Sequence, residues 1–324
     1  MASFIFKNIY LNDYFTIVGP LEKNSHLKHY NMALKDYYDG EKTFEQAEIK
    51  MQKNSIKNIL ERNNLNENDI DLAVGGDLIN QISITNYAVK NFDFPFLGLY
   101  SACATFIESL ITGALFLEKN NMHNVLAFTS SHNLTTERQF RYPVEYGAPK
   151  KTTSTFTATG AICTYLSKKE SKIKIESGTI GTVIDYGISD ANNMGAVMAP
   201  AAAKVLQNHL LDLKRDINYY DLILTGDLGC VGASIFKEFL KANYNLKIKN
   251  YQDAGCELYL KNQETYAGGS GPVCLPLIFF DKIIPSGKYH KILLIGTGSL
   301  QSTVLVNQHK SIPGIAHAIS MEVI

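Results

Sequence analysis

The sequence DLAVGGDL at residues 71–78 returns in slightly altered form, DLILTGDL, at residues 221–228. The two copies start 150 residues apart, which fits the length of one half of a duplicated chain. Each copy consists of an acidic residue, a run of mostly apolar residues and a Gly-Asp turn. This pattern predicts a buried parallel strand that ends in a polar, functional loop.

The repetition extends to the segments on either side of both copies. An amphipathic helix is predicted before each copy, the first starting at Thr43 with Gln46 three residues on, and the second over residues 199–213. A second pair of apolar strands is predicted at residues 123–131 and 290–298. These alternating units predict an α/β fold made of two similar αβα-layered halves, each with a mixed, mostly parallel sheet covered by helices.

Each strand of the second pair follows a predicted long apolar helix, at residues 102–118 in the first half and 271–281 in the second. No stretch between the halves has the composition of a linker. We therefore divide the chain into an N-terminal half, residues 1–170, and a C-terminal half, residues 171–324.

The composition narrows the functional classes. The chain has 324 residues, of which 45% are hydrophobic, and equal numbers of basic and acidic residues, 31 each, so no positive excess favours nucleic acid as a partner. Five cysteines without regular spacing predict neither a disulfide framework nor a metal site. The longest apolar patch, residues 272–280, is too short to cross a bilayer. We expect a soluble protein of a reducing compartment.

Cys103 is the first candidate for chemistry, because it stands where an extended segment meets a predicted helix. The positive end of the helix dipole is expected to lower the pKa of a thiol at this place, which would make Cys103 a nucleophile. Burial as a small packing residue is the alternative, and packing is also expected for the other four cysteines.

A nucleophilic thiol needs a base and donors for an oxyanion. His132, at the end of the strand over residues 123–131, and His317, near the end of the second half, are the two candidates for the base. A structural role is equally open for each histidine.

Two arginines at i,i+3 spacing, Arg138 and Arg141, lie among aromatic residues and could grip carboxylates and stack on a planar ring. The alternative is an ordered surface loop in which they pair with Glu137 and Glu145. The glycine-rich residues 267–271 resemble an anion-binding loop, although close backbone packing also explains them.

These features together carry a resemblance. A duplicated chain with a cysteine at a helix start is similar to the thiolase superfamily, which includes the ketoacyl synthases. More specifically, the chain resembles the stage V sporulation protein AD family of spore-forming Firmicutes. The segments that carry this resemblance occur in order along nearly the whole chain, at residues 76–81, 101–103, 129–133, 137–143, 198–203, 221–228 and 267–271.

The resemblance implies that ordinary thiolase catalysis is absent. In condensing enzymes of the superfamily, the strand end in the second half supplies a histidine, and the glycine-rich turn supplies an asparagine or a second histidine. Gly226 and Gly269 stand at these places here. Loss of such cooperating groups costs orders of magnitude in rate, yet the pocket can still bind a ligand.

The resemblance also implies a ligand. The family binds dipicolinic acid, pyridine-2,6-dicarboxylate, and belongs to a membrane complex that moves this acid with calcium into the developing spore. It places Asp77 and Cys103 in the pocket, where Asp77 either shares the calcium of the chelate or only orders its loop.

We add Asn80, His132, Arg138 and Arg141 to the expected binding residues for their chemistry. No metal site or resident cofactor is assigned. The expected partners are dipicolinate, alone or as its calcium chelate, and the integral membrane subunits of the complex. The protein is expected on the cytoplasmic side of the forespore or spore inner membrane, and a homodimer is left open.

Two other functions remain open. The first is an acyl-transferring enzyme of the thiolase or ketoacyl-synthase type, with Cys103 as the nucleophile and His132 or His317 as the base. The second is an assembly scaffold, in which Cys103 and Asp77 would have no functional part.

Overall fold

The computed structural model describes residues 2–119, 121–141 and 146–324. The strands are β1 (Ser3–Val18), β2 (Met32–Ala33), β3 (Leu72–Gly76), β4 (Phe96–Gly98), β5 (Asn124–Ser131), β6 (Phe156–Thr157), β7 (Gly160–Ser167), β8 (Ile173–Thr179), β9 (Leu222–Thr225), β10 (Tyr251–Asp253), β11 (Gly269–Ser270), β12 (Lys291–Ser299) and β13 (Gly314–Val323). The α-helices are α1 (Pro20–Lys23), α2 (Phe44–Arg62), α3 (Ser83–Val89), α4 (Thr105–Lys119), α5 (Asn133–Phe140), α6 (Met194–Asp212), α7 (Gly229–Tyr244), α8 (Ala254–Leu258), α9 (Cys274–Ile278), α10 (Ile284–Ser286) and α11 (Thr303–Asn307).

The repeated phrase forms equivalent strands, as predicted: its first copy contains β3 and its second contains β9. The predicted helix at Thr43 is α2, and the Thr43 hydroxyl caps it by accepting from the Gln46 N–H at 3.2 Å. The helix predicted at residues 199–213 is α6, which starts earlier because Asn193 caps it. The helix predicted at residues 271–281 is present as a continuous helical stretch over residues 274–286, formed by α9, a π-helical turn and α10 in succession.

The main sheet shows the duplication in its strand order, β10-β9-β12-β13-β8-β1-β7-β5-β3-β4. Read outward from the β1–β8 pair, the two sides have matching connectivity. The outer pairs of each side are parallel, as predicted. The pairs nearer the middle are antiparallel. In the second half, residues 300–313 with the short α11 connect β12 to β13, which pair in antiparallel fashion.

The predicted α/β class, with two similar halves and helices covering a mixed sheet, is confirmed. The predicted boundary between residues 170 and 171 falls in the turn between β7 and β8. A turn at this position does not show whether the two halves are separate domains, so the division stays a prediction.

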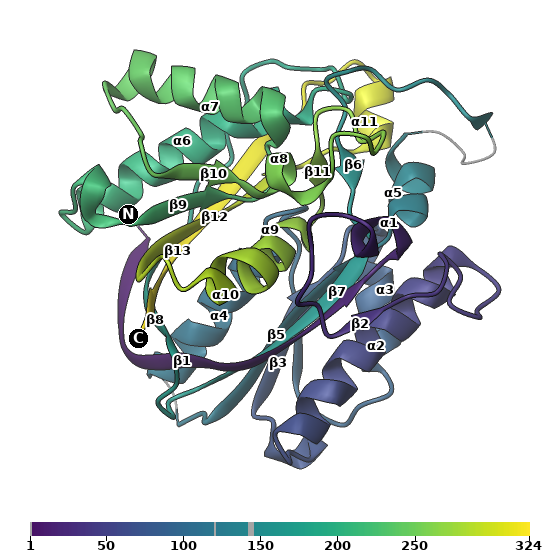
Figure 1. The fold of residues 1–324 in the computed structure, drawn as a ribbon, viewed down its shortest axis with the longest axis vertical. Helices are drawn as coiled ribbons and strands as arrows, with labels where there is room; N and C mark the ends of the chain where they lie inside the picture. Colours follow the sequence, from purple (N-terminus) through teal and green to yellow (C-terminus); the bar gives the residue numbers. More distant parts are fainter. Residues whose placement is uncertain (1, 120, 142–145) are drawn as a thin grey trace.

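Five layers result from the folding of the sheet around the central helices (Figure 1). Helix α2 covers one outer face, α6 and α7 cover the other, and α4 lies between the strands of the two halves with α9 and α10. The largest apolar cluster of the described residues joins α4 and α9 to strands from both halves. Because α4 packs in this central cluster, its first residues lie in the middle of the molecule.

Candidate functional site

Cys103 lies in the turn between β4 and α4, two residues before the helix begins, close to its predicted place. The turn is tight: Ala102 has a φ of 49°, and the Thr105 hydroxyl accepts from the Ser101 N–H at 3.0 Å while donating to the Ala102 carbonyl at 2.7 Å. These bonds fix the thiol at the point where α4 meets the strand ends of the second half.

The Cys103 thiol lies close enough to Asp227, in the loop after β9, for the two groups to influence each other electrostatically. One carboxylate oxygen of Asp227 accepts from the Thr297 hydroxyl at 2.5 Å, and the other accepts from the Gly271 N–H at 3.1 Å. Asp227 is only 1% exposed. Three segments of the second half therefore hold one buried carboxylate against a cysteine of the first half.

This environment contradicts the expected activation of Cys103. Burial and the Asp227 carboxylate raise the pKa of the Cys103 thiol well above its usual value, and only the Gly271 N–H acts in the opposite direction. Loss of hydration and a neighbouring negative charge outweigh the helix dipole, which contributes weakly beyond its first turn. Burial also raises the pKa of Asp227, to about 6, so near pH 7.5 a carboxylate faces a protonated thiol.

His132 is held by backbone groups of its own half. Its Nδ1 accepts from the Leu134 N–H at 3.2 Å, which caps α5, and its Nε2 lies 2.8 Å from the Tyr37 carbonyl. The ring stacks on Phe44 with centroids 5.4 Å apart. Burial lowers the pKa of His132 to about 4. These contacts match the structural alternative for this histidine.

His317 lies closer to the cysteine loop. Its Nδ1 accepts from the Gly181 N–H at 3.2 Å, so its Nε2 carries the proton and faces the Ser101 hydroxyl at 3.3 Å. Burial lowers the pKa of His317 to about 4. The histidine thus supports the turn that precedes Cys103.

Two adjoining cavities lead to Cys103. The outer cavity has a volume of about 540 Å³, within the range of small-molecule sites, and its lining includes Asn80, Tyr100 and Gln139. The inner cavity has a volume of about 30 Å³ and is lined by Cys103. Both are lined by Phe140 and Gln301, which places the two cavities side by side.

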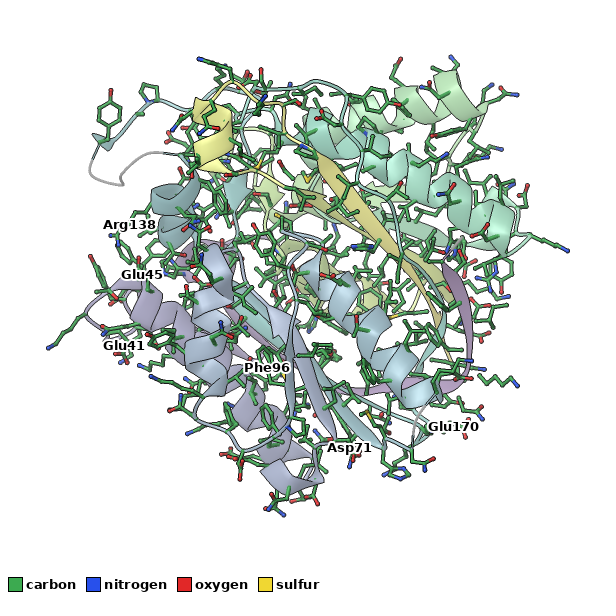
Figure 2. The ribbon with its side chains drawn as sticks, turned by 180° about the vertical axis from the view of Figure 1, so that it is seen from behind. Glu41, Glu45, Asp71, Phe96, Arg138 and Glu170 are labelled. Atoms are coloured by element: carbon green, nitrogen blue, oxygen red, sulfur yellow. A yellow bond between two sulfur atoms is a disulfide. The ribbon has the colours of Figure 1, made fainter. Side chains whose placement is uncertain are left out.

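The structure separates the two predicted arginines. Arg141 lines the inner cavity, pairs with Glu137 and donates to the Thr155 carbonyl at 3.1 Å. Arg138 instead pairs with Glu45 at 2.8 Å on the outer surface, where Figure 2 shows both side chains. Tyr142, Pro143 and Glu145 of this predicted stretch lie outside the described residues.

Asp77 and Asn80 also have different surroundings. The carboxylate of Asp77 is buried and accepts from the Ile79 N–H at 2.7 Å and the Thr85 N–H at 2.8 Å, so it orders the loop before α3. A shared calcium ion stays a prediction for Asp77. Asn80 lines the outer cavity, as expected of a binding residue.

Gly226 and Gly269 differ in what they face. A Cβ at Gly226 would lie 3.3 Å from the Thr297 hydroxyl, beside Asp227, whereas a Cβ at Gly269 would lie 3.2 Å from Cys274 Sγ. The correspondence of these glycines to the catalytic residues of condensing enzymes stays a prediction.

Asp227 is the main site residue that the sequence analysis missed. Its signal was present, since it occupies the same place in the second copy of the phrase as Asp77 does in the first. The comparison of the two copies drew attention to Gly226, and the carboxylate of the neighbouring Asp227 was not considered.

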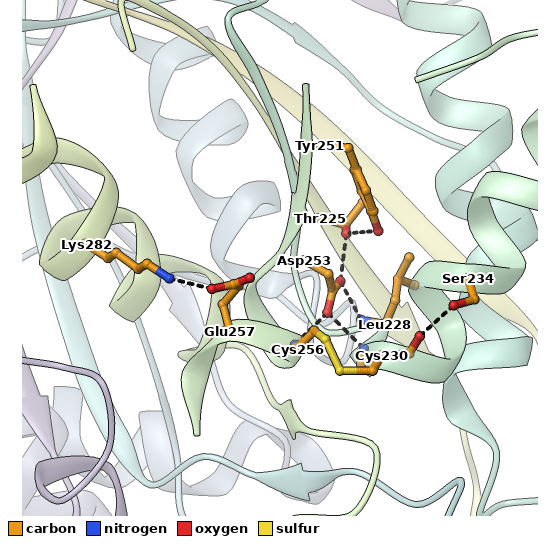
Figure 3. Close-up of a disulfide and its surroundings, with 10 residues drawn as sticks. Thr225, Leu228, Cys230, Ser234, Tyr251, Asp253, Cys256, Glu257 and Lys282 are labelled. Atoms are coloured by element: carbon orange, nitrogen blue, oxygen red, sulfur yellow. Dashed lines mark hydrogen bonds and ion pairs between the residues drawn. A yellow bond between two sulfur atoms is a disulfide. The ribbon is translucent and has the colours of Figure 1, made fainter. Parts of the chain in front are cut away.

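The expectation that no cysteine forms a disulfide was wrong. Cys230 and Cys256 are joined, near the starts of α7 and α8, at a sequence separation of 26 and with Cα atoms 4.8 Å apart (Figure 3). Nearby, Asp253 accepts from the N–H groups of Leu228, Gly229 and Cys256. Disulfide and carboxylate together fasten the loop that carries Asp227.

No group of three or more His, Cys, Asp and Glu side chains in residues 2–119, 121–141 and 146–324 is arranged to hold a metal ion. Over the same ranges, the structure contains no helix with the length and apolar character needed to span a membrane.

Fold comparison defines the class of protein. The structure is similar to that of an OleA variant from Xanthomonas campestris, with a TM-score of 0.60, 12% identity and coverage of 98% of this chain and 99% of the other. It is also similar to 3-oxoacyl-[acyl-carrier-protein] synthase III from Aquifex aeolicus, with a TM-score of 0.52, 14% identity and coverage of 99% and 100%. The predicted thiolase-like fold is therefore confirmed.

Sequence comparison then identifies the family. The family model described as stage V sporulation protein AD matches residues 2–322. Stage V sporulation protein AD of Bacillus subtilis is 38% identical over 318 residues, which are 97% of this chain and 94% of that protein. The chain belongs to the stage V sporulation protein AD family.

Proposed function

We propose that this sporulation protein binds dipicolinate in the two cavities above Cys103 and hands it on without catalysing a reaction. In this proposal, integral subunits of a sporulation complex hold the protein at the forespore or spore inner membrane. Membership of the stage V sporulation protein AD family supports a role in sporulation. The choice of ligand comes from the resemblance on which the sequence analysis relied.

The outer cavity supports binding of a small planar acid. Its volume of about 540 Å³ suits a single aromatic ring with its substituents. Tyr100 and Phe140 offer ring faces at its wall, and Asn80, Gln139 and Gln301 offer amide donors.

The pairing of Cys103 with Asp227 is the observation that carries the non-catalytic part. Acyl transfer to cysteine needs the thiolate, and a desolvated thiol beside a buried carboxylate is held in its protonated form. His132 and His317, the predicted bases, make hydrogen bonds to groups other than Cys103.

Acyl transfer remains the second candidate, because the similar folds include a 3-oxoacyl-[acyl-carrier-protein] synthase and the resemblance places Cys103 at the nucleophile position. At this low identity the likeness concerns the fold alone. A stable thioester on Cys103 would favour the enzyme.

Titration calorimetry with dipicolinate, with and without calcium, tests the proposal, beside intact-mass analysis after incubation with acyl-coenzyme A. We expect saturable binding and no acyl adduct. Pyridine-3,5-dicarboxylate is the control ligand, since its carboxylates do not converge on the ring nitrogen. Replacing Arg141 with Lys should weaken binding, whereas Arg138→Lys on the outer surface should not. An acyl adduct on Cys103, or heat changes no larger than those of the control ligand, would refute the proposal.

A further inference from the structure

The inner cavity has an unusual chemical lining. Thr136, Ser270 and Ser299 all contribute to this lining, and each residue is at most 7% exposed. None of the three hydroxyls has a hydrogen-bond partner among the residues that the structure describes. They come from α5, β11 and the end of β12, so distant parts of the chain converge on one small space.

Unpartnered hydroxyls are costly when buried. Each loses its hydrogen bonds to water and gains none from the protein, so such groups are rare in folded proteins and require an explanation. Three at one cavity are explained together if a polar group from outside the chain accepts hydrogen bonds from all of them.

The charge around the cavity favours an acceptor. Arg141 lines it and has further N–H groups beyond those used on Glu137 and the Thr155 carbonyl. Lys150 pairs with the same Glu137 at 2.9 Å, so this carboxylate is shared by two cations. Asp227 is not among the residues that line the cavity, and its carboxylate accepts from the Thr297 hydroxyl and the Gly271 N–H.

The volume limits what can enter. About 30 Å³ is enough for a small polar group and is far below the volume of about 540 Å³ of the outer cavity. A ligand that fills both cavities must therefore leave its ring in the outer one, past Phe140 and Gln301.

We propose that Thr136, Ser270, Ser299 and Arg141 form a carboxylate subsite that takes one of the two carboxylates of the ligand, while the ring and the second carboxylate stay in the outer cavity. This inference rests on the proposed binding of dipicolinate. It assigns the inner hydroxyls the role of distinguishing a ring that bears a carboxylate from one that does not.

Calorimetric titration of the variants Thr136→Val, Ser270→Ala and Ser299→Ala with dipicolinate tests the subsite. Each is expected to bind roughly tenfold more weakly or worse, the loss typical of one hydrogen bond to a charged group. Thr155→Val is the matched control, since the Thr155 hydroxyl is also buried and unpartnered but does not line the inner cavity. Its affinity should equal that of the unaltered protein.

Thermal unfolding without ligand separates loss of binding from loss of structure. The three subsite variants should unfold at or above the midpoint of the unaltered protein, because each removes a buried polar group that has no partner. Unaltered affinity in Ser270→Ala and Ser299→Ala would overturn the subsite and leave the proposed function standing. Failure of the unaltered protein to bind dipicolinate would overturn both.

Discussion

At the scale of single residues, Asp77 and Asp227, the two equivalent aspartates of the repeated phrase, make different contacts. Asp77 accepts from N–H groups of its own loop, whereas Asp227 reaches across to Cys103 of the other half. Equivalent positions in a duplicated fold thus hold the same side chain for different purposes. The low reactivity expected of Cys103 depends on the second of them.

Asp227→Asn tests that dependence. Removing the negative charge should lower the pKa of the Cys103 thiol and speed its alkylation by iodoacetamide between pH 7 and 9, measured by mass spectrometry of the Cys103 peptide. Asp185→Asn, at an exposed carboxylate, is the control. Equal or slower alkylation in Asp227→Asn would show that another feature keeps the thiol protonated.

A buried carboxyl on α2 makes stability depend on pH. Burial, with Asp77 nearby, raises the pKa of Glu48 from 4.5 to about 8, although Ser130 and Thr135 donate hydrogen bonds to it. The folded state therefore holds this proton where the unfolded chain has released it. The contribution of Glu48 to stability is present below about pH 4.5 and is lost as the pH rises towards 8.

Glu48→Gln should flatten this dependence. The free energy of unfolding, measured in urea from pH 5 to pH 8, should fall less steeply in the variant than in the unaltered protein. Glu61→Gln, at an exposed position of the same helix, should leave the slope unchanged. If the free energy of unfolding of Glu48→Gln falls with pH as steeply as that of the unaltered protein, another group is responsible for the pH dependence.

At the scale of elements, the disulfide between α7 and α8 fastens the loop that carries Asp227. Cys230→Ser with Cys256→Ser should lower the free energy of unfolding by about 2–4 kcal/mol, as expected for opening a loop of this length. Denaturant titration with and without a dithiol measures this effect. The dithiol should lower the free energy of unfolding of the unaltered protein and leave that of the double variant unchanged. A decrease in both proteins would show that the dithiol acts on something other than this disulfide.

At the scale of the whole molecule, β1 joins the halves by pairing with β7 on one side and β8 on the other. Residues 1–170 expressed alone would leave the β8 edge of β1 open, and an unpaired edge favours aggregation. We expect this fragment and residues 171–324 to be insoluble alone and soluble when co-expressed, measured by fractionation and circular dichroism. Cooperative unfolding of either fragment as a monomer would show independent domains.

The repeated phrase was enough to predict most of the fold. Strong periodic patterns located β3, β9, α2 and the strands that follow, because local sequence dominates in long apolar elements. The antiparallel middle of the sheet depends on connections that carry no such pattern. The disulfide was missed for a related reason, since Cys230 and Cys256 meet only after α7 and β10 have packed.

The candidate site was predicted less well than the fold. The position of Cys103 follows from its place before a helix, but the direction of its pKa shift depends on Asp227, which arrives from a distant segment. Arg138 and Arg141 have the same residue type and neighbouring positions, yet burial separates them. Such differences are set by three-dimensional packing and are invisible in spacing alone.

The position of β13 has a consequence for synthesis on the ribosome. This strand lies between β12 and β8 in the interior of the sheet, although it is translated after every other described strand. Before β13 has emerged from the exit tunnel, β12 and β8 each lack the partner that joins them, although β8 can already pair with β1. The sheet therefore stays open between β12 and β8 until β13 emerges, and chaperones are expected to protect the exposed strand edges at this stage.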